Sequence, residues 1–127
     1  MNYPQNSHLS NNASYNLQDV STMCRGNNDQ VLKMIELFID QIPKFISEIN
    51  TAFSDNNTVK IKKEVHKIKP TVHFFGAFKL EQQLLLMNES ALDKLNTTEL
   101  ELTIKNCNLL AEEVINDLIT DYKLTKN

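Results

Sequence analysis

The sequence predicts an all-α protein, an antiparallel up-and-down four-helix bundle with a short additional N-terminal helix. Two glycines and three prolines in 127 residues leave few interruptions, and residues that favour helices are plentiful. Apolar residues recur at spacings of three and four, the period of one face of an α-helix. Short polar stretches separate these periodic segments, and helices joined by short turns pack antiparallel. The chain length suits one domain with a single core.

The N-terminal segment, residues 1–14, is predicted to be a flexible tail. It is rich in Asn and Ser and almost free of aliphatic residues, so it cannot bury enough surface to offset the entropy of ordering. The helical domain is expected over residues 15–125. It begins with a short amphipathic helix, which Gly26 is expected to end. The apolar residues of this helix are Leu17, Val20, Met23 and Cys24.

A long core helix is predicted from about Asp29 to Phe53. Pro43 lies inside it and should bend the helix near Ile39, because proline lacks an N–H and clashes with the carbonyl four residues back. Residues 54–57 then form a turn, and Asn57 or Thr58 is expected to cap the next helix. The apolar stripe of the long helix consists of Val31, Ile35, Phe38, Ile42, Phe45, Ile49 and Phe53.

Three further helices follow. A central helix over residues 58–75 buries Ile61, Val65, Ile68, Val72 and Phe75, and Gly76 is placed to end it. The next helix is built on Phe78, Leu84, Leu85, Leu92 and Leu95, with Met87 and Ala91 beside them. The last helix, to about Lys123, opens with a predicted Thr98–Glu101 capping box and buries Ile104, Cys107, Ala111, Val114, Leu118 and Tyr122.

Composition narrows the classes of function. No segment approaches the ~20 apolar residues of a membrane span, and the first residues lack the basic and apolar regions of a signal peptide, so a cytoplasmic location without membrane contact is expected. The net charge of −3 argues against general nucleic-acid binding. Cys24 and Cys107 lack metal-type spacing and are predicted to be reduced core residues. A monomer is expected, because the helices have enough mutual apolar surface.

The central helix carries a second stripe that is polar: Lys62, His66, Lys69, Pro70 and His73. The two histidines cannot easily share a metal, because seven helical residues rise about 10.5 Å whereas zinc ligands must converge within roughly 3 to 4 Å. A hydrolytic centre is also disfavoured, since no Ser or Cys is spaced for a dyad with His66 and a small bundle offers little concavity.

His66 itself is the candidate nucleophile. A neutral imidazole leaves a ring nitrogen free to attack phosphorus. Lys69, one turn further on, is placed to reach phosphoryl oxygens, while Lys62 and Lys67 add positive field. The competing interpretation is a solvated lysine face on which His66 is an ordinary surface residue.

The run His66-Lys67-Ile68-Lys69, with Pro70 next and Gly76-Ala77 ten and eleven positions after the histidine, resembles the signature of histidine-containing phosphotransfer (HPt) domains. That signature is commonly written H-x-x-K-G followed by a later glycine, and the resemblance extends over residues 15–123. It implies a phosphorelay intermediate of two-component signalling, a phosphohistidine carrier rather than a stand-alone turnover enzyme. His66 would accept a phosphoryl group from a receiver-domain aspartyl phosphate and pass it to another receiver aspartate.

The resemblance also implies partners and a docking surface. The partners would be response-regulator receiver domains and a hybrid sensor histidine kinase, and the receiver would supply Mg²⁺, so this chain would bind no cofactor or metal of its own. Docking is expected on Lys62, Lys67, Pro70, His73 and Gly76, with exposed apolar residues such as Leu17 or Val20. Pro70 departs from the pattern, because the family usually has glycine there; function is expected to tolerate it. The alternative is a helical interaction module that docks a receiver or kinase without carrying phosphate.

Overall fold

The computed structural model describes residues 14–92 and 97–124, and in this part of the chain every regular element is a helix. The helices are α2 (Gln18–Met23), α3 (Asn28–Ser54), α4 (Thr58–Phe74), α5 (Phe78–Leu92) and α6 (Thr97–Asp121). The predicted all-α class is therefore confirmed. The predicted tail lies outside the described residues except for Ser14, and Leu95 lies outside them as well.

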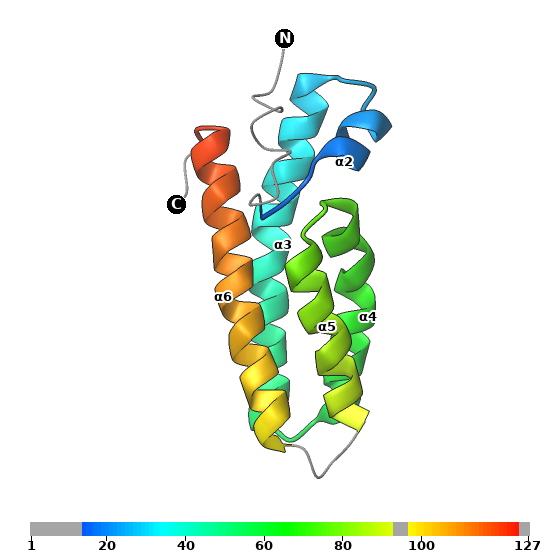
Figure 1. Cartoon of the computed structure of the whole chain (residues 1–127), viewed down its shortest axis with the longest axis vertical. Coiled ribbons are helices and arrows are strands. Elements are labelled where there is room, and N and C mark those ends of the chain that lie inside the picture. The colour runs from blue at the N-terminus through cyan, green and yellow to red at the C-terminus, as the bar shows by residue number, and fades with distance from the viewer. Residues whose placement is uncertain (1–13, 93–96, 125–127) are drawn as a thin grey trace.

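The four long helices lie side by side around a shared core (Figure 1). Helix α3 packs against α4 and α6, and α5 packs against the same two helices from the other side. The short helix α2 contacts α3 near one end of the molecule (Figure 1). Turns of three residues join α3 to α4 and α4 to α5, so the helices within each of these pairs run in opposite directions.

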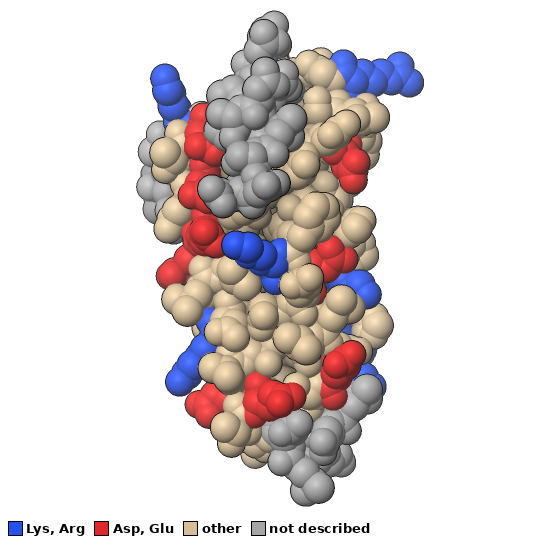
Figure 2. Space-filling model, viewed as in Figure 1, with Lys and Arg blue, Asp and Glu red and all other residues tan. Residues whose placement is uncertain are grey.

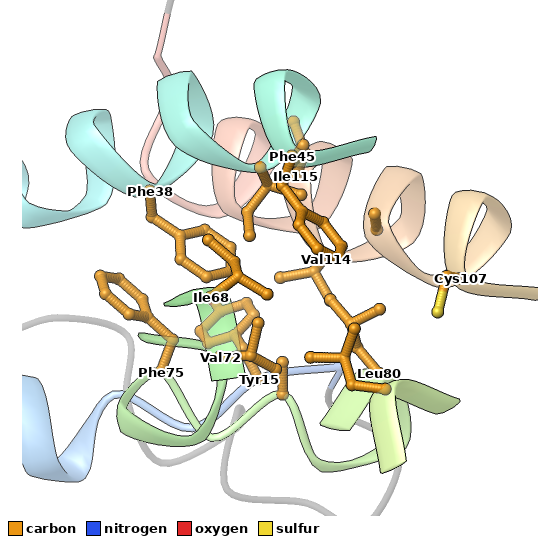
Figure 3. Packing of buried hydrophobic residues seen from close by; sticks show 14 of the residues in the cluster. Tyr15, Phe38, Phe45, Ile68, Val72, Phe75, Leu80, Cys107, Val114 and Ile115 are labelled. Carbon is orange, nitrogen blue, oxygen red and sulfur yellow. The ribbon is translucent and has the colours of Figure 1, made fainter. Parts of the chain in front are cut away.

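The core is formed by the apolar stripes that the sequence predicted on α3 and α4. Every predicted residue of the α4 stripe is buried, as are all those of the α3 stripe except Phe53, which is partly buried. Side chains from α3, α4, α5 and α6 meet in the centre, where the rings of Phe38 and Phe75 stack with centroids 4.3 Å apart (Figure 3). Cys24 and Cys107 are buried and free, which confirms their predicted reduced state.

Helix ends follow the predicted capping chemistry at several positions. The Asn57 side chain accepts a hydrogen bond from the Lys60 N–H at 3.0 Å and caps α4, and Asn27 caps α3 in the same way. Gly26 and Gly76 follow α2 and α4 with positive φ angles of 73° and 65°, a conformation that glycine adopts without steric cost. Helices α3 and α4 both continue through their internal prolines, Pro43 and Pro70.

Other predictions for the outer helices were wrong in detail. Phe78 and Leu85 are exposed, because the buried stripe of α5 runs instead through Leu80, Leu84, Met87 and Ala91. Thr98 lies inside α6, which already includes Thr97, so the predicted Thr98–Glu101 capping box does not form. Tyr122, which was predicted to be buried, follows the end of α6 and is only partly buried. Met23, one of the apolar residues of the short first helix, is exposed.

The segment before α2 packs against the end of the bundle and forms hydrogen bonds with it. Tyr15 is buried and its hydroxyl donates to a carboxylate oxygen of Asp121, while the Ser14 Oγ donates to Asp117 at 2.6 Å. The Asn16 N–H donates to the Phe75 carbonyl at 3.0 Å. These contacts join the start of the domain to the ends of α4 and α6.

Across residues 14–92 and 97–124, no helix is long and apolar enough to cross a membrane.

Candidate functional site

The candidate site is the polar stripe of α4. His66, Pro70 and His73 are exposed, and Lys62 and Lys69 are partly exposed, whereas the apolar stripe of the same helix is buried. Because the apolar stripe must face the core, helix geometry alone turns His66 toward solvent. The structure thus places the predicted nucleophile on an accessible surface near the middle of a long, capped helix.

Lysines surround His66 on its own helix. Lys62 and Lys63 lie one turn before it, and Lys67 and Lys69 lie within one turn after it. In the described part of the chain no side chain forms a hydrogen bond or ion pair with His66. Its ring nitrogens are therefore open to a group that approaches from outside.

The lysines of α4 differ in how far their charge is neutralised. Lys60 Nζ lies 3.1 Å from Glu48 on α3 and 3.6 Å from Glu64, and the hydrogen bond to Glu48 raises the pKa of Lys60. Lys67 Nζ also lies 3.6 Å from Glu64. Glu64 thus draws Lys60 and Lys67 toward the seam between α3 and α4, on the side of the helix away from α5.

Lys62, Lys63 and Lys69 form no ion pair within the described residues. Among the described residues, these three lysines are consequently the unpaired positive charges closest to His66. Lys67 was predicted to add to this field, and its pairing with Glu64 reduces that contribution. An open surface depression of about 780 Å³, lined in part by His66, Lys62, Lys63 and Lys67, follows the N-terminal half of α4.

His73 is tied to the neighbouring helix. Its Nδ1 lies 3.0 Å from both carboxylate oxygens of Glu81 on α5, and since a carboxylate only accepts, Nδ1 carries the proton. The His73 ring also contacts the Phe78 ring, with centroids 5.9 Å apart. The structure therefore separates the two histidines, because His73 has a partner within the fold.

Pro70 is exposed one turn after His66. Because proline has no N–H, the His66 carbonyl receives no hydrogen bond from the residue four positions on. One regular hydrogen bond of α4 is therefore missing beside the candidate nucleophile. The residues at this point of the helix, His66 and Pro70, are exposed, so the loss is inexpensive.

Part of the predicted docking surface is wrong. Gly76 is buried, and a Cβ built on it would lie 2.5 Å from the Asn16 carbonyl oxygen, so this glycine serves the turn and its packing. Leu17 and Val20 are also buried, because both pack into the core cluster that includes Tyr15 and Cys24. The exposed apolar residues of α2 and α3 are instead Met23 and Leu37.

Sequence reasoning missed Asn88. Its Oδ1 is buried and has no hydrogen-bond partner in the described part of the chain. The contact between His73 and Glu81 places these two residues at the same level of the antiparallel helices α4 and α5. His66 lies two turns before His73 on α4, and Asn88 lies two turns after Glu81 on α5, so these two residues are level with each other as well. Asn88 therefore lies across the α4–α5 seam from His66, a position that depends on interhelical register and leaves no signal in the sequence.

The described residues contain no group of three or more His, Cys, Asp or Glu side chains placed to hold a metal ion. Comparison of the chain with protein-family models, with curated proteins and with solved structures finds no match. The site is therefore defined by its own chemistry, an open imidazole within a cationic helix face.

Proposed function

We propose that this protein is a phosphohistidine carrier of the HPt type. His66 accepts a phosphoryl group from an aspartyl phosphate on one receiver domain and passes it to an aspartate on another. The observation that carries the proposal is the exposed imidazole of His66 with three lysines within one turn of it, none of which has a hydrogen-bond or ion-pair partner among residues 14–92 and 97–124. This arrangement offers a nucleophile together with charge that attracts a phosphoryl group.

The transfer requires little of this chain beyond the nucleophile. The lone pair of an unprotonated ring nitrogen forms a bond to phosphorus, the bond from phosphorus to the aspartate oxygen breaks, and the aspartate leaves as a carboxylate with the electron pair. The proton on the other ring nitrogen passes to solvent. Onward transfer is the reverse step, with a carboxylate of the second receiver as the nucleophile.

The lysines have separate roles in this proposal. The Lys69 ammonium is one turn from His66 and donates hydrogen bonds to phosphoryl oxygens, while Lys62 and Lys63 lower the cost of gathering negative charge beside the ring. A divalent cation would be repelled by these lysines, so Mg²⁺ is assigned to the acidic pocket of the receiver, where it neutralises charge on the transferring group.

The fold is compatible with this role. We propose that α3 to α6 form an antiparallel up-and-down four-helix bundle with α2 as the additional N-terminal helix, as the HPt resemblance implies. The proposed protein is a cytoplasmic monomer whose partners are response-regulator receiver domains and a hybrid sensor histidine kinase. Met23 and Leu37, which are exposed on α2 and α3, replace Leu17 and Val20 as candidate apolar docking residues.

Transfer of label from a receiver tests the carrier function. Purified receiver domains with a radiolabelled aspartyl phosphate are mixed with the protein and Mg²⁺, and label on this chain is measured. We expect acid-labile label on the natural chain, as a phosphorus–nitrogen bond requires, and none on His66→Ala. His73→Ala is the matched control, because it removes another exposed histidine from the same stripe. It should still become labelled, since His73 is proposed as a docking residue and His66 as the acceptor.

Two outcomes would contradict the carrier function. Equal labelling of His66→Ala would place the acceptor elsewhere. Receivers that bind the natural chain but keep all their label would instead identify the alternative, an interaction module that carries no phosphate.

Pro70 has a test of its own. The proposal predicts that the natural chain transfers phosphate and that Pro70→Gly changes the rate only modestly, because the residue is exposed and α4 continues through it. An inactive natural chain that glycine restores to activity would show that proline blocks the site.

A further inference from the structure

The outer face of α5 and α6 carries leucines that the fold leaves exposed. Leu86 on α5 is 46% exposed, and Leu102 and Leu109 on α6 are 58% and 66% exposed. Single exposed leucines are common on protein surfaces, but a group of adjacent ones marks an interaction surface. These three residues are called the leucine patch below.

Two contacts across the seam place the patch in register. The Asn106 Nδ2 lies 3.5 Å from the Gln83 Oε1, and the Ser90 Oγ lies 3.4 Å from Glu99 Oε1. Along α5, Leu86 lies about midway between Gln83 and Ser90. Along α6, Leu102 lies about midway between Glu99 and Asn106. The two leucines therefore lie at about the same level on neighbouring helices, and Leu109 lies two turns beyond Leu102 on α6.

Carboxylates border the leucine patch. Glu89 is three residues after Leu86, Glu99 is three residues before Leu102, and Glu113 is four residues after Leu109, so each leucine has an acidic neighbour one turn away. Within the described residues neither Glu89 nor Glu113 forms an ion pair. Figure 2 shows a largely uncharged area on this face, with acidic side chains below it and both acidic and basic side chains above and beside it.

The charge of this face is opposite to that of α4. Among the residues that the structure describes, helices α5 and α6 carry five exposed glutamates, Glu89, Glu99, Glu101, Glu112 and Glu113, against two exposed lysines, Lys79 and Lys105. Lys105 lies one turn from both Leu102 and Leu109, so the glutamates outnumber the lysines on this face without excluding them. In contrast, α4 carries five lysines against one glutamate. A partner that binds the leucine patch must therefore combine an apolar ridge with positive charge. Leu102 and Leu109 are seven residues apart, a spacing that matches two turns of an apposed helix.

We propose that the leucine patch and its carboxylates form a docking surface for a basic amphipathic helix of another protein. Leucines on the partner cover Leu86, Leu102 and Leu109, and its lysines or arginines lie against Glu89, Glu99 and Glu113. A second copy of this chain does not supply that helix, because its basic helix, α4, buries its apolar stripe in its own core. The surface lies outside the His66 stripe and does not depend on phosphotransfer.

A model peptide tests the proposal directly. The probe is a synthetic helix of roughly 18 residues, built from leucine and lysine with the leucines on one face, and its control is a peptide of the same composition in shuffled order. Binding to the full chain is measured by fluorescence anisotropy and mapped by amide chemical shifts. We expect binding of the amphipathic peptide only, with shifts concentrated on the exposed residues of α5 and α6.

Variants of the chain locate the contact. Leu102→Ser combined with Leu109→Ser should weaken binding at least about tenfold, because two apolar contacts are lost. Val59→Ser, which changes an exposed apolar residue on α4, should alter binding less than about twofold, as expected of a surface site away from the contact. Circular dichroism checks that each variant retains its helices.

Several results would overturn the proposal. They are equal binding of the shuffled peptide, undiminished binding by the double variant, shifts that map to other helices, and no binding at all. Sedimentation of the chain alone gives a further test. A dimer of the natural chain that Leu102→Ser with Leu109→Ser abolishes would assign the leucine patch to self-association instead.

Discussion

Replacing Gly76 by alanine measures how closely the N-terminal segment packs on the end of α4. The substitution has two costs. The φ of 65° strains any residue with a Cβ, by roughly 1–2 kcal/mol. The added Cβ would also lie 2.5 Å from the Asn16 carbonyl oxygen and 2.7 Å from its backbone nitrogen, and overpacking of this kind costs about 1–3 kcal/mol. Together these predict a loss of roughly 2–5 kcal/mol in the free energy of unfolding.

Gly26→Ala is the matched control for this experiment. Gly26 has a similar φ of 73°, but a Cβ there would meet nothing within 4 Å, so only the backbone strain remains. Urea denaturation followed by circular dichroism gives both free energies, and Gly76→Ala should be the more destabilising by about 1–3 kcal/mol. Equal losses for the two variants would refute the close approach of Asn16 to Gly76.

Three more predictions concern the core, the pH dependence of stability and the site. Phe38→Ala should cost about 3–5 kcal/mol in urea denaturation, because it empties a buried aromatic stack, whereas Leu37→Ala on the exposed side should stay within about 0.5 kcal/mol; similar losses would contradict the assigned faces. Burial raises the pKa of the Cys107 thiol to about 12, so this thiol ionises at lower pH in the unfolded chain than in the folded one. The free energy of unfolding should therefore fall above pH 9, at up to about 1.4 kcal/mol per pH unit. Cys107→Ala should remove that part of the fall, and an unchanged profile would contradict it. Lys69→Ala should slow phosphotransfer at least about tenfold, whereas Lys63→Ala, equally far from His66 along α4, should change the rate less than about threefold. Equal effects would show that Lys69 contributes only positive charge and does not bind the phosphoryl oxygens.

Much of the helical pattern follows from local periodicity. The spacing of apolar residues correctly assigned the buried stripes of α3 and α4, and with them the exposure of His66. The same reasoning misjudged Phe78 and Leu85. The apolar residues of α5 are too many for one stripe, so periodicity alone left the choice of buried face open, and the residues that pack between α4 and α6 decided it.

The candidate site likewise has features that the sequence predicted and features that it did not. The sequence located His66 and its lysines on one helix, because residues three and four apart share a face whatever surrounds the helix. The pair of Glu64 with Lys67, three residues apart on α4, is of this local kind and could have been predicted from the spacing. The sequence did not indicate that Glu81 would bind His73 or that Asn88 would lie opposite His66. Each of these depends on how side chains of one helix meet those of another.

By itself the sequence determined an all-helical protein, the inner faces of its two central helices, and an exposed histidine within a run of lysines. Only the tertiary structure decided that Glu81 would bind His73, why Gly76 is required beneath Asn16, and where exposed leucines lie beside carboxylates on α5 and α6. The physical reason is that helical periodicity acts along a single segment. Register, close approach and charge pairing arise between segments that are distant in the chain.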